Sequence, residues 1–415
     1  MDRIKKIGRE TFASLNIRNY RLYFIGQTIS LSGTWMQTIG QSWLVLQLTN
    51  SGAALGLVTA AQFVPMMIFG PWGGVVTDRF DKRKVLYFTQ TASGILAFIL
   101  GALVATGVVR LWMVYVLAVA LGLVNTVDNP TRQTFVVEMV GKENLTNAVS
   151  LNSTLVNLAR VIGPAIGGAL IAIAGLAPLF FINSVSFVAV LVVIWMMNKK
   201  ELYRTPLAEK SQGQLLEGFR YVKSVPALRD TLLMMAIIGT LTYEFAVILP
   251  LVAQFTFHGD ATTYAWLTVT MGLGSMLGGL YTASRRRHSQ KTLINSAWLF
   301  GAVVLLSAVM PTITLELAAM VLVGFYSIIF LSLGNTTLQL ESSPQMRGRV
   351  MALWAVAFLG STPIGGPIIG FIGQYLSPRW GLATGGFAAI LAAVLGYWLY
   401  KKDQANSARH PAPAA

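Results

Sequence analysis

The sequence contains no cysteine, and only 11% of its 415 residues are charged, less than half of the roughly 25% that is usual in soluble domains. The absence of cysteine excludes disulfide frameworks, thiolate nucleophiles and cysteine-ligated metals. Only three histidines occur, His258, His288 and His410, and they show no metal-ligand spacing. No carboxylate pair or nucleophile–base set is evident either. We therefore expect no metal, no other cofactor and no enzymatic activity.

Long apolar runs are what the sequence has instead. Hydrophobic residues make up 54% of the chain, and many runs reach the ~20 residues that a helix needs to cross a bilayer. The net charge of +15 does not indicate a nucleic-acid partner, because the basic residues form short clusters between these runs. We predict twelve spans surrounded by membrane lipids: 20–48, 52–77, 85–107, 111–133, 144–173, 176–198, 229–257, 261–284, 291–311, 314–340, 347–375 and 380–400.

The basic residues are distributed unevenly between the two sides of these spans. Clusters precede the first span, follow the second, sixth, eighth and twelfth, and precede the eleventh, whereas the alternate connections hold only Arg110 and Arg379. Because cytoplasmic loops carry an excess of Lys and Arg, this asymmetry predicts that both termini are cytoplasmic. We expect a multi-pass protein of the cytoplasmic (inner) membrane.

One sizeable connection lies outside the predicted spans, at residues 199–228. Within it, Leu215, Leu216, Phe219 and Val222 share one helical face, which is typical of an amphipathic helix lying on the membrane surface. A flexible linker is the alternative. We predict an N-terminal six-helix bundle at 1–198, a cytoplasmic linker at 199–228, a C-terminal six-helix bundle at 229–401 and a cytoplasmic tail at 402–415.

The two halves repeat one another. The segment GGVVT at 73–77 recurs as GGLYT at 278–282, an offset of 205. Similarly, NPTRQ at 129–133 recurs as NTTLQ at 335–339, an offset of 206, and Gly163-Pro164 recurs as Gly366-Pro367, an offset of 203. Three matches in order at nearly one offset indicate two related six-span halves.

The segment GGVVTDRFDKRK at 73–84 resembles the signature between spans 2 and 3 of the major facilitator superfamily. GPAIGG at 163–168 resembles the antiporter motif of that superfamily, and RGRVMALW at 347–354 resembles a branch with enterobactin and macrolide exporters. The resemblance implies an all-α membrane protein with two pseudo-symmetric six-helix bundles. The residues at the motif positions are Gly74, Asp78, Arg79, Lys82 and Arg83, and then Gly163, Pro164, Gly167 and Gly168.

The charged group after span 2 is a candidate conformational latch. Asp78 lies in the last turn of that span, where a carboxylate facing the N-terminus of another helix gains ~0.3–1 kcal/mol. The resemblance implies that this helix is span 11, and that Arg79, Lys82 and Arg83 brace the contact through span 4. The two halves would then be held together on the inner side. The alternative is a simple positively charged membrane anchor.

Charged residues inside spans are expensive and therefore candidates for function. Asp128 and Arg132 stand four residues apart on span 4, so they share a face and can pair, and Asn125 lies on the same face. Asp128 is either a brace, pairing with Arg79 or Lys82 of the latch, or a proton or substrate site.

Three further groups are candidates for the transport path. Arg160 and Asn157 on span 5 are candidates for contact with substrate, and structural pairing of Arg160 is the alternative. Glu244, near the middle of span 7, is the preferred proton-coupling residue, and an acid at a span end is the alternative; Tyr243 beside it is a candidate for contact with substrate. Polar side chains on span 1 suit an amphipathic ligand or helix packing equally: Thr34, Gln37 and Gln41.

These features predict a secondary transporter that alternates between inward and outward access. We expect it to export a small amphipathic molecule, a siderophore or a drug, in exchange for protons, and to act as a monomer. An uptake permease for a small nutrient and a flippase for lipids or lysolipids are the alternatives.

Overall fold

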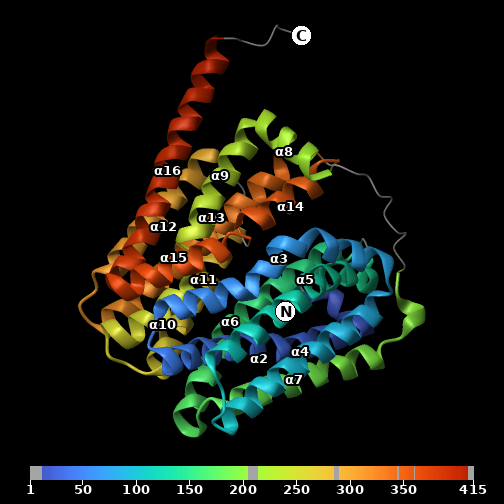
Figure 1. Ribbon diagram of the computed structural model, residues 1–415. Coiled ribbons are helices and arrows are strands. Elements are labelled where there is room, and N and C mark those ends of the chain that lie inside the picture. The colour runs from blue at the N-terminus through green and yellow to red at the C-terminus, as the bar shows by residue number, and fades with distance from the viewer. Residues whose placement is uncertain are drawn as a thin grey trace, which may run out of the picture. The chain divides into compact units, whose positions relative to one another are not determined.

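The computed structural model describes residues 12–203, 214–284 and 289–409, except residues 142, 344 and 359. These residues form helices, with no strand among them (Figure 1). In the first part of the chain the helices are η1 (Ala13–Asn16), α2 (Arg18–Thr49), α3 (Gly52–Arg79), α4 (Lys82–Ala105), α5 (Leu111–Val140), α6 (Leu145–Ala174), α7 (Ala177–Met196) and η2 (Lys199–Glu201). In the second part they are α8 (Gln214–Ser224), α9 (Pro226–Leu241), α10 (Phe245–Leu251), η3 (Val252–Thr256), α11 (Ala261–Ser284), α12 (Gln290–Ala308), α13 (Ile313–Leu340), α14 (Arg347–Phe358), α15 (Thr362–Tyr375) and α16 (Pro378–Arg409).

Ten helical segments in the described part of the chain are long and apolar enough to cross a membrane. They coincide with ten of the predicted spans. The other two predicted spans are also helical, as α2 and α11. Polar side chains make these two helices less apolar than the rest, and those of α2 include three of the candidate substrate residues. The fold is therefore all-α and membrane-spanning, as predicted.

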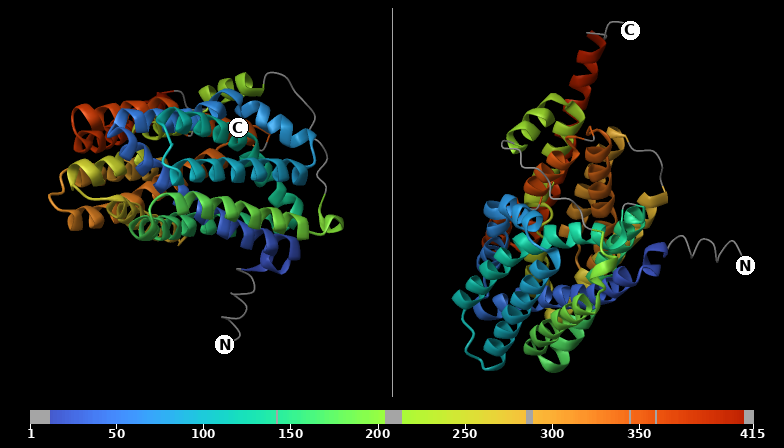
Figure 2. Two further views of the ribbon diagram at one scale, coloured as in Figure 1. Left: turned by 60° about the horizontal axis from the view of Figure 1, so that its bottom comes forward. Right: turned by 90° about the vertical axis from the view of Figure 1, so that its right-hand side faces the viewer.

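The helices divide into two compact units. Unit 1 comprises Met1–Asn50, Ala61–Glu209 and Ala261–Val269, and unit 2 comprises Ser51–Ala60, Lys210–Asp260 and Thr270–Ala415. In unit 1, α4 packs along α7, and α2 packs against α6 and α7 (Figure 1). In unit 2, α16 packs along α12 and α9, and Figure 2 shows its C-terminal end extending away from these helices. The start of α3 thus belongs with unit 2, and the start of α11 with unit 1.

Two of the predicted spans are interrupted in the middle. Span 7 is broken at residues 242–244, between α9 and α10, and a π-helical turn, η3, follows α10. Span 11 is broken between Phe358 and Thr362, where Pro363 opens α15. Proline suits the first turn of a helix but cannot continue a preceding one, since its nitrogen carries no hydrogen. Both breaks lie in unit 2, and they define the site described next.

The connection predicted at 199–228 contains the helix α8, at Gln214–Ser224. Leu215 and Leu216 lie outside the residues whose side chains are described. Phe219 is 59% exposed, whereas Val222 is buried, and the helix packs against α14 and α9. Of the predicted apolar face, Phe219 is therefore exposed, whereas Val222 packs against protein.

Candidate functional site

Glu244 lies at the break in span 7. It is the residue that precedes α10, and its backbone carbonyl accepts hydrogen bonds from the Val247 and Ile248 amides at 3.0 Å. Its side chain is only 3% exposed. The carboxyl group forms a hydrogen bond with the Thr362 hydroxyl, while its Oε1 atom has no hydrogen-bond partner among the described residues. No cation of the described part forms an ion pair with Glu244.

Two glycines of α15 make room for this carboxyl group. A Cβ atom on Gly365 would lie 2.9 Å from Oε1 of Glu244 and 1.6 Å from the Thr240 carbonyl oxygen, and one on Gly366 would lie 3.5 Å from Oε2. A side chain at position 365 would therefore press against the acid and the Thr240 carbonyl, whereas one at position 366 would only touch the acid. The broken span 11 thus presents bare backbone to the break in span 7, where irregular backbone is tolerated because protein surrounds it.

The start of α3 crosses α15 through four glycines, which we call the glycine seam: Gly52, Gly56, Gly366 and Gly370. A Cβ atom on Gly56 would lie 2.3 Å from the Gly366 carbonyl oxygen, and one on Gly370 would lie 2.3 Å from the Gly52 carbonyl oxygen. Each helix carries two glycines four residues apart, the spacing that lets membrane helices approach closely. Beside the seam, the Ser51 hydroxyl donates to Oε1 of Gln374 at 2.6 Å.

A small hollow adjoins Glu244. Its volume is about 10 Å³, close to the minimum that one water molecule needs. Its lining comes from the broken span 7, α12, α15 and α16. The Thr242 hydroxyl donates to the Gly385 carbonyl at 2.8 Å and so ties the break to α16. The lining also includes Val304 of α12 and Gly385 of α16.

Tyr243, a predicted substrate contact, is held in an aromatic cluster instead. Its hydroxyl donates to the Ser327 carbonyl at 2.5 Å. Its ring centroid lies 4.7 Å from that of Phe358 and 5.5 Å from that of Phe300, both in tilted or edge-on geometry. Such contacts stabilise packing, so the structure favours a supporting role for Tyr243 beside Glu244.

A second buried acid of unit 2, Glu316, was missed by the sequence analysis. It lies in the first turn of α13 and is completely buried. The Ser307 hydroxyl donates to its Oε1 atom at 2.7 Å, and Oε2 has no hydrogen-bond partner among the described residues. Glu316 could have been found from the sequence, because it is an acid at the third residue of the predicted span 314–340.

In unit 1, Asp128 is buried in a complete hydrogen-bond network. Thr89 and Gln90 of α4 donate to its Oδ1 atom at 2.5 and 2.8 Å, and Arg132 Nε lies 2.5 Å from Oδ2. Arg132 also donates to Gln27 of α2. The predicted pairing of Asp128 with Arg132 is therefore present, and the sequence analysis missed the two other partners of Asp128 and the partner of Arg132. A carboxylate that is both paired and fully hydrogen-bonded favours the role of a brace.

The predicted pairing of Asp128 with Lys82 is wrong. Lys82 forms an ion pair with Glu138, with Nζ 2.5 Å from Oε1. Glu138 and Asp128 are ten residues apart on α5, which places them ~15 Å apart along its axis. Lys82 begins α4 and so meets the end of α5 rather than its middle. Arg83 is buried and donates to the Ile194 carbonyl of α7 at 2.5 Å.

The remaining latch residues lie at the end of α3. Arg79 is exposed, and a Cβ atom on Gly74 would meet nothing within 4 Å. Asp81 caps α4, because its carboxylate accepts from the Arg83 amide at 2.9 Å. The side chain of Asp78 lies outside the described part of the structure, so its contact with span 11 stays a prediction.

Arg160 on α6 lies over the indole of Trp35 on α2, with its guanidinium carbon 4.9 Å from the ring centroid. Both side chains are half-buried, as are Asn125 on α5 and Asn157 on α6. The Asn157 amide donates to the Ser153 carbonyl at 3.0 Å. The structure thus joins the span 1 and span 5 candidates through Arg160 and Trp35, in a cation–π pair.

The other span 1 candidates differ in exposure. Thr34 is exposed, with its hydroxyl bonded to the Ser30 carbonyl at 2.9 Å, and Gln41 is half-buried. Gln37 is buried and accepts a hydrogen bond from the Asn183 amide of α7 at 2.6 Å. Gln37 therefore braces α2 against α7, which leaves Thr34 and Gln41 as the accessible members of the set.

The antiporter-type glycines sit at close helix crossings. A Cβ atom on Gly163 would lie 2.6 Å from a backbone oxygen of α2, and one on Gly167 would lie 3.0 Å from a side chain of that helix. A Cβ atom on Gly168 would lie 2.4 Å from that of Ala265, on the part of α11 that belongs to unit 1. Pro164 is buried within α6, which continues through it.

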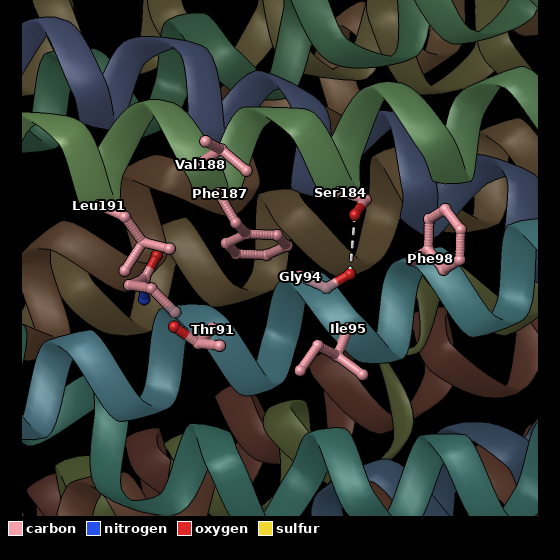
Figure 3. Close-up of a pocket in the computed structure, with 9 residues that line it drawn as sticks. Thr91, Gly94, Ile95, Phe98, Ser184, Phe187, Val188 and Leu191 are labelled. Atoms are coloured by element: carbon pink, nitrogen blue, oxygen red, sulfur yellow. Dashed lines mark hydrogen bonds between the residues drawn. The ribbon is translucent and has the colours of Figure 1, made fainter.

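A separate cavity of about 250 Å³ lies between α4 and α7. Figure 3 shows its apolar side chains facing one another across the two helices, with Ser184 donating to the Gly94 carbonyl. Ile95, Phe98 and Val188 are more than half exposed. An open apolar groove of this kind on membrane-spanning helices suits a lipid chain, and it contains none of the candidate transport residues.

Comparison with known proteins identifies the family. A family model described as a transmembrane secretion effector matches residues 9–414. The chain belongs to this family of the major facilitator superfamily. It is 22% identical over 388 residues to the staphyloferrin A transporter of Staphylococcus aureus, covering 92% of this chain and 96% of that protein. It is 26% identical over 386 residues to the enterobactin exporter EntS of Shigella flexneri, covering 91% and 90%.

Solved structures show the same fold. A bacterial homologue of the human lysosomal transporter Spinster, in an inward-facing conformation, matches with a TM-score of 0.72 at 14% identity, covering 96% of this chain and 99% of that one. A transporter of the POT family matches with a TM-score of 0.76 at 10% identity, covering 93% and 96%. The predictions of family, fold class and absence of enzymatic activity are confirmed. The chain is an integral membrane transporter of small molecules.

Proposed function

We propose that this transporter exports a small amphipathic molecule, a siderophore or a drug, across the inner membrane in exchange for protons. Two of the relatives are named for siderophore transport or export, which supports the substrate class and the direction. The observation that carries proton coupling is Glu244, a buried acid at the meeting of two broken helices. The charge distribution of the loops supports cytoplasmic termini, and we expect the transporter to work as a monomer.

Glu244 has the surroundings of an acid that binds and releases a proton. An ionised carboxylate that is buried without a cation costs several kcal/mol, and no such cation is present among the described residues. The protonated carboxyl group is neutral and avoids this cost. Its proton can sit on Oε1, the oxygen that accepts no hydrogen bond from the described residues. Ionisation therefore requires the surroundings to change. A change of conformation at this point would couple proton release to the transport cycle.

Unit 1 supplies the polar groups for a ligand. Arg160 over Trp35 offers a cation beside an aromatic face, which suits an anionic or aromatic ligand. Thr34 and Gln41 on α2 and Asn157 on α6 add polar groups on the same two helices. Because Asp128 is already fully bonded, we assign it to the framework rather than to proton transfer.

Energised inside-out vesicles test the proposal, with enterobactin and an amphipathic cationic dye added in turn while the interior pH is followed. The proposal predicts that at least one of these compounds discharges the proton gradient with the native protein and fails to do so with Glu244→Gln. The matched control is Glu341→Gln, an exposed acid at the end of α13, which should behave as the native protein. Equal discharge by Glu244→Gln would exclude Glu244 as the coupling residue. Movement of nutrients or lysolipids without any proton-linked export would support uptake or lipid transport instead.

A further inference from the structure

Glu316 is a buried acid that the proposed function does not yet use. It is completely buried, and its Oε2 atom has no hydrogen-bond partner among the described residues. A packing acid normally satisfies both carboxyl oxygens, because an orphaned buried polar atom costs ~1–3 kcal/mol. The orphaned oxygen therefore indicates that Glu316 has a role other than packing.

Two helices connect Glu316 with Glu244. On α12, Val304 lines the hollow beside Glu244, and Ser307, which donates to Glu316, follows three residues later. Residues three apart lie on one helical face at a rise of ~4.5 Å. On α16, Gly385 lines the same hollow. The hollow therefore lies directly beside Glu244, and Ser307, the hydrogen-bond partner of Glu316, lies about one helical turn beyond it along α12.

The charged surroundings of the two acids differ. Arg379, near the start of α16, is close enough to Glu316 to interact with its charge, and it also donates to the Met310 carbonyl at 2.8 Å. The remaining polar neighbour of Glu316 is the Ser307 hydroxyl. Glu244 faces only the Thr362 hydroxyl among the described residues. Glu316 thus has an arginine near enough to offset a negative charge, whereas no described cation forms an ion pair with Glu244.

Glu316 also lies nearer to the outer side, given the orientation that the basic loops predict. It stands in the first turn of α13, directly after the short connection from α12. That connection is one of those nearly free of Lys and Arg, which the charge rule places outside.

We propose that Glu316 is a second proton-carrying residue, which passes protons between the outer side and Glu244 through water that enters between Glu316 and the hollow. The Glu316 carboxylate takes up a proton from the outer side. Its O–H bond then breaks as the water accepts that proton, and the water gives a proton to the Glu244 carboxylate. Glu316 returns to its ionised form beside Arg379, and Glu244 becomes neutral. The proposal rests on proton coupling at Glu244. Because the hollow has room for about one water molecule, the proton can be transferred only while the hollow is hydrated.

Purified protein in liposomes tests this step with radiolabelled enterobactin. Two activities are compared: uptake driven by an imposed pH gradient, and exchange of labelled for unlabelled enterobactin without a gradient. Glu316→Gln is expected to lower gradient-driven transport at least tenfold and to flatten its pH profile, while exchange stays within about twofold of the native rate. Glu316→Asp should restore part of the driven transport, and Glu341→Gln serves as the unaffected control.

The outcomes separate this inference from the proposed function. If the native protein exchanges enterobactin but ignores the pH gradient, proton antiport itself is refuted. If Glu244→Gln uncouples transport while Glu316→Gln keeps native driven transport and pH profile, only the role of Glu316 is refuted. Loss of exchange together with driven transport in both Glu316→Gln and Glu316→Asp would identify a packing residue and overturn the inference.

Infrared spectroscopy of the protein in lipid provides a readout that needs no substrate. Titration with pH should show a carboxylic-acid C=O band that is lost in Glu316→Gln and a second band that is lost in Glu244→Gln. The Glu341→Gln control should retain both bands. A native spectrum without a titrating band that depends on Glu316 would overturn the inference, whether or not enterobactin is carried.

Discussion

The glycine seam makes a quantitative prediction about how readily α3 and α15 separate. In Gly56→Ala, the added Cβ would lie 2.3 Å from the Gly366 carbonyl oxygen and 2.8 Å from its carbonyl carbon. Backbone cannot yield as a flexible side chain can, so α3 and α15 must move apart. Overpacking of this kind costs ~1–3 kcal/mol. Because every 1.4 kcal/mol changes an equilibrium tenfold, the separated state should gain about fivefold to hundredfold in population.

The chain itself offers a clean assay for this separation. It contains no cysteine, so a single introduced thiol is the only maleimide target. Thr59 is half-buried on α3, and its Cβ is 3.8 Å from a Cβ placed on Gly366. Thr59→Cys should therefore react slowly in otherwise native protein and about fivefold to hundredfold faster when Gly56→Ala is added.

A matched control lies on the same helix. Gly70→Ala adds a Cβ that meets nothing within 4 Å, and both substitutions raise helix propensity by the same ~1 kcal/mol. The difference in labelling rate between the two variants thus reports the seam alone. If Thr59→Cys reacts at one rate in both backgrounds, the seam does not hold α3 against α15 in solution, and the reasoning is refuted.

Two further perturbations test the ion pairs. Asp128→Asn leaves Arg132 partly buried without its counter-charge, so thermal denaturation in detergent should show a loss of about 3–5 kcal/mol in the free energy of unfolding. Adding Arg132→Gln should restore part of this loss, whereas an unchanged melting temperature for Asp128→Asn would contradict the brace. Glu217→Gln removes the pair with Arg349, in which the Glu217 side chain is 61% exposed. The free energy of unfolding should then change by less than ~1 kcal/mol, and a larger loss would mean that this pair is more than a surface contact.

Much of the fold follows from the sequence, because membrane spans are long and uniformly apolar. All twelve predicted spans are helical, and α11 occupies the predicted residues 261–284. Hydropathy cannot reveal a break inside an apolar run, since the residues on both sides of it are equally apolar. For that reason the interruptions at 242–244 and between α14 and α15 were not predicted, even though Pro363 marks the second one.

The sites show where prediction from one sequence ends. Glu244 stands out as an acid deep in a span, and Asp128 and Arg132 stand out by their spacing. The partners Thr89 and Gln90 of Asp128, and Gln27 of Arg132, could not be inferred, because they come from other helices and only the packed structure brings them together. The pairing of Lys82 was predicted wrongly for the same reason.

The position of Glu244 links its proton to the glycine seam. Its Oε2 atom lies 3.5 Å from a Cβ placed on Gly366, the residue whose backbone meets Gly56. A neutral acid can stay beside this backbone, whereas a carboxylate needs a cation or more water than the single molecule for which the hollow has room, and admitting either would require α15 to move. Protonation therefore favours the closed seam and ionisation favours its opening. Under the proposed export cycle, a proton taken up from outside closes the outer side, and its release inside allows the outer side to reopen with the substrate bound. That order keeps the proton and the substrate from crossing together, which an antiporter requires.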